Sequence, residues 1–150
     1  MFRLSKLTDY AVVVLARLGR ADGIATSPGI AASTGLPEPT VAKVLKLLAA
    51  QKLVVSQRGA RGGYKLARPL DTMAVADVIA AIDGPIALAA CVDGGACETE
   101  CLCPMRGRWD PVNRAIRDAL ERITLAELTH KPCMPPAPRA DAAAPIHVAV

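Results

Sequence analysis

Apolar residues recur at helical spacing through the first third of the chain. The clearest stripe follows the i, i+3, i+4, i+7 pattern of a helix with one buried face and consists of Val41, Val44, Leu45 and Leu48. This stripe predicts a helix over residues 36–53. Residues 8–20 are predicted to form an amphipathic helix. Residues 26–35 are predicted to form a short helix because of the residues at their two ends.

The ends of these segments carry capping signals. Thr8 or Asp9 is predicted to cap the first helix, and Ser27 is predicted to cap the second. Pro28 suits the first helical position, and Gly35 can end the second helix in a left-handed conformation. Two helices joined by a tight glycine turn are typical of a helix-turn-helix.

Two β-prone runs follow, over residues 53–57 and 64–67. The six residues between them are rich in glycine and arginine, which predicts a hairpin with a long, glycine-rich tip. A hairpin directly after a helix-turn-helix indicates the wing of a winged helix.

The second half of the chain predicts two more helices. One covers 73–85, with Asp71 or Thr72 as its cap, and the last covers 110–128. An apolar seam near the last helix repeats almost every seven residues and suits pairing with a second copy of the chain: Trp109, Val112, Ile116, Ala119 and Ile123, continued by Ala126. The alternative is a helix that packs on its own domain.

These elements predict a mainly α fold with a small β-hairpin, in which a winged helix-turn-helix precedes a long C-terminal dimerisation helix. The expected organisation is a DNA-binding domain over 1–70, a helix and cofactor loop over 71–105, a dimerisation helix over 106–130 and a disordered tail over 131–150. The tail is rich in proline and alanine and offers little surface to bury.

Charge divides along the same boundaries. Residues 1–70 hold eleven Lys/Arg and three Asp/Glu, whereas residues 71–105 hold six acids and no Lys/Arg. A basic amino-terminal half favours a polyanionic partner such as double-stranded DNA. No apolar run approaches the length of a membrane span, and no signal peptide is evident, so we expect a cytoplasmic protein without a membrane partner.

A helix-turn-helix reads DNA with the amino-terminal part of its second helix, in the major groove. The residues expected at base edges are therefore Glu38, Pro39, Thr40 and Lys43. At the wing tip, Arg58 and Arg61 suit the narrow minor groove. Lys46, Lys52 and Lys65 are expected to contact phosphates.

Four of the five cysteines lie within residues 91–103. Cys91, Cys97 and Cys103 are spaced C-x5-C-x5-C, with Cys101 inside the second gap, among small, acidic and turn-forming residues. In a reducing compartment such cysteines indicate metal ligands or redox groups rather than disulfides. The spacing favours an iron–sulfur cluster and leaves open a zinc site, a thiol switch or buried thiols.

Several stretches together resemble the winged-helix iron–sulfur regulators of the IscR and NsrR type. They are LSKLTDYAVVVLARL, LPEPTVAKVLKLL, RGARGGYKLARP, ADVIAAIDGPI, the three cysteines followed by PMRGRW, and VNRAI. The variant with LCPMRGRW is most similar to the regulators encoded with the SUF system of cluster assembly. The resemblance implies a homodimer that binds a near-palindromic operator with an affinity set by a [2Fe–2S] or [4Fe–4S] cluster.

The resemblance also implies the cluster ligands. Cys91, Cys97 and Cys103 occupy the family's three cysteine positions. Some relatives place a histidine where this chain has Arg106, which cannot serve as a ligand. Other relatives use an acid in the first helix of the partner subunit, which points to Asp9 as the fourth ligand, with Cys101 as the alternative.

The predicted function is therefore a cluster-sensing transcriptional repressor of SUF genes, and not an enzyme. One alternative is a repressor of the same family that senses nitric oxide or redox state. Another, from a different class, is an electron or cluster carrier that does not bind DNA. Such a carrier has no use for the basic amino-terminal half.

Overall fold

The computed structural model describes residues 4–59, 62–92, 95 and 103–130. Its elements in chain order are α1 (Lys6–Gly19), α2 (Ser27–Thr34), α3 (Glu38–Ala50), β1 (Val54–Gln57), β2 (Gly63–Leu66), the 3₁₀ turn η1 (Leu70–Thr72), α4 (Val75–Asp83), α5 (Asp110–Arg122) and α6 (Leu125–His130). The prediction of a mainly helical fold with one small hairpin is confirmed.

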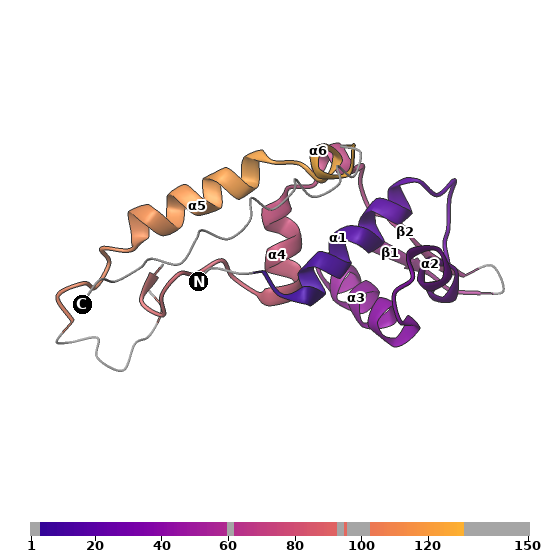
Figure 1. The fold of residues 1–150 in the computed structure, drawn as a ribbon, viewed down its shortest axis with the longest axis horizontal. Helices are drawn as coiled ribbons and strands as arrows, with labels where there is room; N and C mark the ends of the chain where they lie inside the picture. The colour runs from indigo at the N-terminus through magenta and orange to yellow at the C-terminus, as the bar shows by residue number, and fades with distance from the viewer. Residues whose placement is uncertain (1–3, 60–61, 93–94, 96–102, 131–150) are drawn as a thin grey trace, which may run out of the picture.

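Helices α1, α2 and α3 pack on one another, and α4 covers α1 and α3. The hairpin of β1 and β2 lies beside α1 and α3, and α6 lies against η1. Figure 1 shows α5 projecting away from this body, with its carboxyl end close to α6 and the start of α4. Across the described ranges, no helix is long and apolar enough to cross a membrane.

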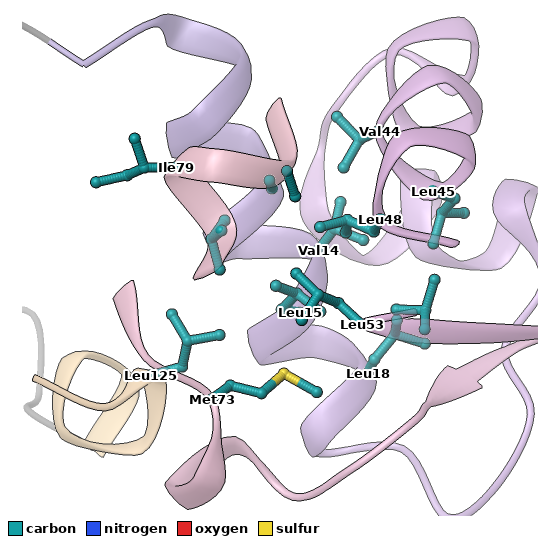
Figure 2. Close-up of a cluster of buried hydrophobic side chains, with 14 of the residues drawn as sticks. Val14, Leu15, Leu18, Val44, Leu45, Leu48, Leu53, Met73, Ile79 and Leu125 are labelled. Atoms are coloured by element: carbon teal, nitrogen blue, oxygen red, sulfur yellow. The ribbon is translucent and has the colours of Figure 1, made fainter. Parts of the chain in front are cut away.

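The core lies between α1, α3 and α4 (Figure 2). The stripe predicted from residues 41–48 is buried, and it faces Val14, Leu15 and Leu18 of α1. Burying one such aliphatic side chain contributes about 1.5–3 kcal/mol. Met73 and Leu125 are also fully buried, so the start of α4 and the start of α6 belong to the same core.

Two helices begin earlier than their predicted caps. Ser5, rather than Thr8 or Asp9, caps α1, since its hydroxyl accepts a hydrogen bond from the backbone N–H of Thr8 at 3.1 Å. Thr26, rather than Ser27, caps α2 by accepting from the N–H of Gly29 at 3.2 Å. In each case a hydroxyl residue further upstream satisfies the free N–H groups of the first turn.

The predicted end of α2 is confirmed, because Gly35 has a left-handed φ of 73°. Helix α4, however, follows Ala74 and not Asp71 or Thr72, which lie within η1. The carboxylate of Asp77 takes the capping role, since it accepts a hydrogen bond from the N–H of Ala74 at 3.1 Å.

The hairpin is antiparallel, with Val54 opposite Leu66 and Gln57 opposite Gly63. A third segment joins it, because Ala25 and Tyr64 exchange backbone hydrogen bonds of 2.9 and 2.8 Å. Gly63 allows this close approach, since a Cβ there would lie 2.6 Å from the carbonyl oxygen of Ala25. The loop before α2 therefore braces the base of the wing.

The single helix expected over 110–128 is two helices. Ile123 is extended, with φ −91° and ψ 121°, and it separates α5 from α6. The cause is tertiary pairing: the N–H of Val75 donates to the carbonyl of Ile123 at 2.9 Å, and the N–H of Leu125 donates to Met73 at 2.9 Å. The apolar repeat continues through this break, so periodicity alone did not reveal it.

Helix α3 ends in a Schellman motif in which lysine takes the position usually held by glycine. The N–H of Leu53 donates to Leu48 at 2.9 Å, the N–H of Lys52 donates to Ala49 at 3.0 Å, and Lys52 has a φ of 58°. A residue with a Cβ is strained by about 1–2 kcal/mol in this region.

We therefore expect Lys52→Gly to stabilise the fold by about 0.5–1 kcal/mol, since relief of strain exceeds the greater entropy of the unfolded chain. Gln51→Gly, one residue earlier at φ −94°, is the matched control and should destabilise. Urea unfolding at fixed protein concentration measures both variants. A loss of stability in Lys52→Gly would contradict the account of this turn.

Candidate functional site

The predicted DNA-reading residues lie on the first two turns of α3. Pro37 precedes the helix, and Pro39 lies in its first turn, where a missing N–H costs nothing. Thr40 is half-buried, and the others predicted on α3 are exposed: Glu38, Pro39, Lys43 and Lys46. These residues lie outside the buried apolar face of α3. The core fixes that apolar face, and the polar side chains are left toward solvent.

Helix α2 is attached to α1 and α3. The side chain of Ile30 is buried in the core, and the guanidinium Nε of Arg17 donates to the Ser33 hydroxyl at 2.9 Å. The hydrogen bond fixes α2 to α1, and α2 also packs on α3, as a helix-turn-helix requires.

The wing carries the other predicted DNA contacts. Arg58 and Lys65 are exposed, whereas Arg61 lies outside the described residues. At the tip, Gly59 has a φ of 116° and its carbonyl accepts from the N–H of Gly62 at 2.9 Å. A Cβ on Gly62 would lie 2.6 Å from the carbonyl oxygen of Gln57, so this tight turn requires glycine.

Two of the predicted cluster ligands lie within the described residues. Cys91 and Cys103 are both half-buried free thiols, whereas Cys97 and Cys101 lie outside the description. Cys91 is inside a turn closed by a hydrogen bond from the N–H of Val92 to the carbonyl of Ala89 at 3.2 Å. Cys103 opens a second turn, where its carbonyl accepts from the N–H of Arg106 at 3.3 Å.

A buried asparagine that sequence reasoning missed holds the segment before Cys91. Asn113 of α5 is 1% exposed. Its Nδ2 donates to the carbonyl of Ile86 at 3.0 Å, and its Oδ1 accepts from the N–H of Leu88 at 3.0 Å. The amide therefore attaches the chain leaving α4 to α5. The available signal was a polar residue on the otherwise apolar face that includes Ile116 and Leu120.

Asp9, the proposed fourth ligand, is exposed in the first turn of α1. Its neighbour Thr8 is 1% exposed and donates to the carboxylate of Asp83, the last residue of α4, at 2.7 Å. The start of α1 and the end of α4 are thereby joined. Within the described ranges, no three acidic, histidine or cysteine side chains gather into a metal site.

Asp83 is held in its charged form by these contacts. Burial raises its pKa, but hydrogen bonds from the hydroxyls of Ser5 and Thr8 and from the backbone of Ser5 outweigh that effect. The pKa of Asp83 therefore lies below its ordinary value of 3.8. The contact favours the fold at neutral pH and is lost only as pH falls through that lowered pKa.

The seam predicted for dimerisation is divided between two environments. Ile116 packs partly against the core of its own chain. Trp109 and Val112 are 42% and 44% exposed, and Ala119 and Ile123 are also exposed. An exposed apolar stripe on a projecting helix is a common mark of a protein interface.

Known proteins are similar to this chain in sequence over most of its length. The sequence model of Rrf2, described as an iron-dependent transcriptional regulator, matches residues 4–131. The protein Rv1287 of Mycobacterium tuberculosis is 34% identical over 131 residues, covering 84% of this chain and 80% of the relative. The HTH-type transcriptional regulator IscR of Erwinia tasmaniensis is 30% identical over 130 residues, covering 85% of this chain and 79% of the relative.

Solved structures give the same result. CymR, the global cysteine regulator of B. subtilis, superposes with a TM-score of 0.66 at 27% identity, covering 86% of this chain and 97% of CymR. IscR of T. potens gives a TM-score of 0.61 at 28% identity and covers 85% of each chain.

The resemblance to IscR-type regulators is thus confirmed, and so is the winged-helix fold class. The relatives are transcriptional regulators, which also confirms the prediction that the chain is not an enzyme. Taken with the outward-facing polar groups of α3 and the braced, basic wing, these matches show that the chain belongs to the Rrf2 family of DNA-binding transcriptional regulators.

Proposed function

We propose that this regulator is a cluster-sensing repressor of SUF-type cluster-assembly genes, and that a cluster at Cys91, Cys97 and Cys103 sets its operator affinity. The chain between α4 and α5, residues 84–109, contains four cysteines and is here called the cysteine segment. The observation that carries the proposal is that Asn113 of α5 holds the start of this segment at Ile86 and Leu88. A structural change in that segment would act on α4 and α5, which it connects. Helix α4 packs on α1 and on α3, the helix that carries the predicted DNA contacts.

The described donors fit an iron–sulfur cluster. Cys91 and Cys103 are free, and half-buried thiols remain accessible to iron while the protein shields part of the site. Thiolates are the ligands such clusters take. The turn at Gly95 leaves no room for a side chain, because a Cβ there would collide with the carbonyl oxygen of Ala90. We propose Asp9 of the partner subunit as fourth ligand, with Cys101 as the alternative.

When bound, a cluster would hold Cys91, Cys97 and Cys103 on one centre and so fix the path of the chain between α4 and α5. The charge of this part of the chain also bears on DNA binding. Residues 71–105 carry six acidic groups and no Lys/Arg. An anionic segment opposes the approach of DNA phosphates to the basic half. By linkage, a tenfold change in operator affinity requires about 1.4 kcal/mol of coupling.

The predicted roles on DNA follow from the exposed groups. Glu38, Pro39, Thr40 and Lys43 at the start of α3 are proposed to meet base edges in the major groove. Arg58 and Arg61 are proposed to enter the minor groove, and Lys46 and Lys65 to contact phosphates.

Replacing Lys43 by alanine should weaken operator binding by about 1–3 kcal/mol if it reads a base edge. Arg122→Ala removes the same charge from the end of α5, outside the proposed surface, and serves as the control. Fluorescence anisotropy with the operator and with a scrambled duplex measures both variants. Equal losses in Lys43→Ala and Arg122→Ala would contradict the proposed docking of α3.

The exposed stripe of α5 is proposed to pair two copies of the chain. A two-fold dimer would place two recognition helices about one turn of DNA apart, or a multiple of it, on a near-palindrome. Val112→Glu puts a charge into this stripe, and we expect a shift toward monomer and weaker operator binding. Light scattering after gel filtration measures the mass. Arg114→Glu, exposed on the same helix, is the matched control, and a dimeric Val112→Glu would contradict the proposal.

The cofactor itself is tested by oxygen-free isolation, iron and sulfide analysis, and the visible absorption spectrum. The proposal predicts coloured protein with iron and acid-labile sulfide in similar amounts. Zinc in place of iron would indicate a zinc site. Metal-free protein whose thiols change oxidation state would indicate a thiol switch. A cluster that responds first to nitric oxide would change the signal but not the site.

A further inference from the structure

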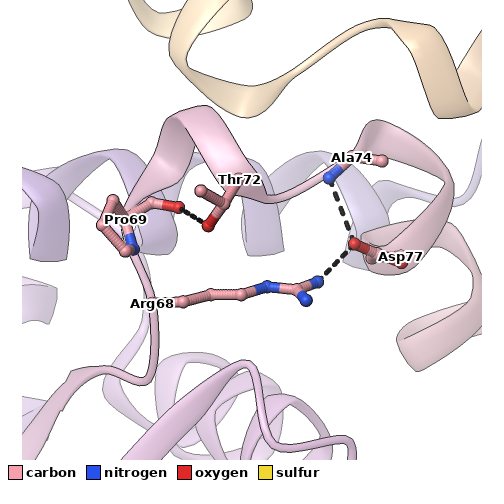
Figure 3. A network of polar contacts seen from close by, with 5 residues as sticks. All are labelled: Arg68, Pro69, Thr72, Ala74 and Asp77. Carbon is pink, nitrogen blue, oxygen red and sulfur yellow. Dashed lines mark hydrogen bonds and ion pairs between the residues drawn. The ribbon is translucent and has the colours of Figure 1, made fainter.

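One carboxylate joins the wing to α4. Arg68 lies two residues after β2, and its guanidinium Nη2 meets Oδ2 of Asp77 at 2.5 Å (Figure 3). The same oxygen accepts the hydrogen bond of 3.1 Å from the N–H of Ala74 that caps α4. The chain that leaves the wing is therefore attached to the first turn of α4.

The connection between these residues is short and ordered. Residues 70–72 form the 3₁₀ turn η1, and the Thr72 hydroxyl donates to the carbonyl of Pro69 at 2.8 Å (Figure 3). Helix α6 packs on this turn. The connection between Arg68 and Asp77 is therefore held by its own hydrogen bonds and by packing.

The start of α4 is anchored to the end of α5. The backbone hydrogen bonds of residues 73–75 with 123–125 join the two helices, and Met73 and Leu125 are both 0% exposed. At their other ends, α4 stops at Asp83 and α5 begins at Asp110, so the two helices flank the cysteine segment. A structural change in that segment would therefore act on two helices that are joined at the opposite end.

We propose that Arg68 and Asp77 are the positioning pair through which the state of the cysteine segment reaches the wing. The inference rests on the proposed cluster-sensing function and adds the route of communication. Asp77 lies in the first turn of α4, beside the anchored residues 73–75, so a tilt of α4 about that end would turn its carboxylate and the Arg68 side chain bonded to it. The pair is exposed, with side chains 45% and 40% accessible. Such pairs add little to stability, so loss of the pair should test placement of the wing without unfolding the protein.

The test compares cluster-loaded and cluster-stripped protein by amide hydrogen exchange and by operator titration. In the wild type, loading should change exchange both in residues 84–92 and in the wing, residues 54–66. In Arg68→Gln the change in 84–92 should persist while the change in the wing is lost. In Arg68→Gln, the ratio of operator affinities of cluster-loaded and cluster-stripped protein should lie about two- to fivefold closer to one than in the wild type. This range corresponds to the energy of an exposed ion pair.

Three further variants separate positioning from simple loss of charge or structure. Asp77→Asn keeps an acceptor for the N–H of Ala74 and should behave like Arg68→Gln. Arg68→Lys keeps the ion pair and should retain most of the coupling. Lys65→Gln removes a charge from β2 and should weaken binding of both states equally, with an unchanged ratio.

The outcomes distinguish this inference from the function on which it depends. If loading changes exchange in neither segment, both the proposed function and the positioning pair are rejected. If residues 84–92 respond and the wing of Arg68→Gln responds as in the wild type, the pair is rejected and cluster sensing stands. The pair is also rejected if cluster loading of the wild type changes hydrogen exchange in residues 84–92 but not in the wing.

Discussion

Replacing Cys91 by alanine is expected to give a folded protein that retains no iron or sulfide and binds the operator with one affinity under all conditions. Cys91 lies in the turn that directly follows Leu88, which Asn113 holds, so its replacement removes a proposed ligand without removing a core side chain. Three thiolates can hold a cluster with one weaker ligand, whereas two thiolates leave half of the coordination to exchangeable groups.

The measurement is iron and sulfide content after anaerobic reconstitution, followed by operator titration of treated and untreated protein. Cys133→Ala is the control, because no role is assigned to this residue of the carboxyl-terminal region. It should keep both the cluster and the difference in affinity. Cys101→Ala addresses the fourth ligand: full retention of the cluster favours Asp9, and loss favours Cys101. A Cys91→Ala protein with wild-type iron content would refute the ligand assignment.

The second large effect is expected at Asn113. Asn113→Ala leaves the carbonyl of Ile86 and the N–H of Leu88 without their partner and opens a small cavity. Each buried group left unpaired costs about 1–3 kcal/mol, so the free energy of unfolding should fall by about 2–4 kcal/mol in total. The cysteine segment should also loosen, and iron should pass to a chelator faster than from the wild type.

Thermal or urea unfolding at fixed protein concentration measures the free energy of unfolding. The rate at which the protein loses its colour in a chelator measures the release of iron. Arg114→Ala changes an exposed neighbour on the same helix and should alter neither quantity appreciably. A stability loss below about 0.5 kcal/mol in Asn113→Ala would be that of an ordinary surface substitution and would contradict the proposed role of Asn113 in holding Ile86 and Leu88.

The recognition helix and the wing could be predicted because local sequence determines them. Val41, Val44, Leu45 and Leu48 form one face for the core, and the glycines after Arg58 allow the tight turn that a side chain at Gly62 would block. The caps were harder to predict, because Ser5 and Thr26 compete with neighbouring residues that have equal capping power.

The features that couple the parts of the molecule were not predicted, since each depends on residues distant in sequence. Ile123 leaves the helical conformation because Val75, almost fifty positions earlier, takes its carbonyl. Asn113 likewise bonds to residues 25 and 27 positions earlier, and the Arg68–Asp77 pair forms only when the turn η1 brings the chain after β2 beside α4. Neither periodicity nor spacing reports such contacts.

The most direct test of the central claim uses the unmodified protein and the DNA upstream of its own gene. Anaerobically isolated protein and the same preparation after removal of iron are titrated against this duplex at one salt concentration. The account predicts coloured, iron-containing protein and two affinities that differ by about tenfold or more. Colourless protein without iron, or two equal affinities, would contradict it.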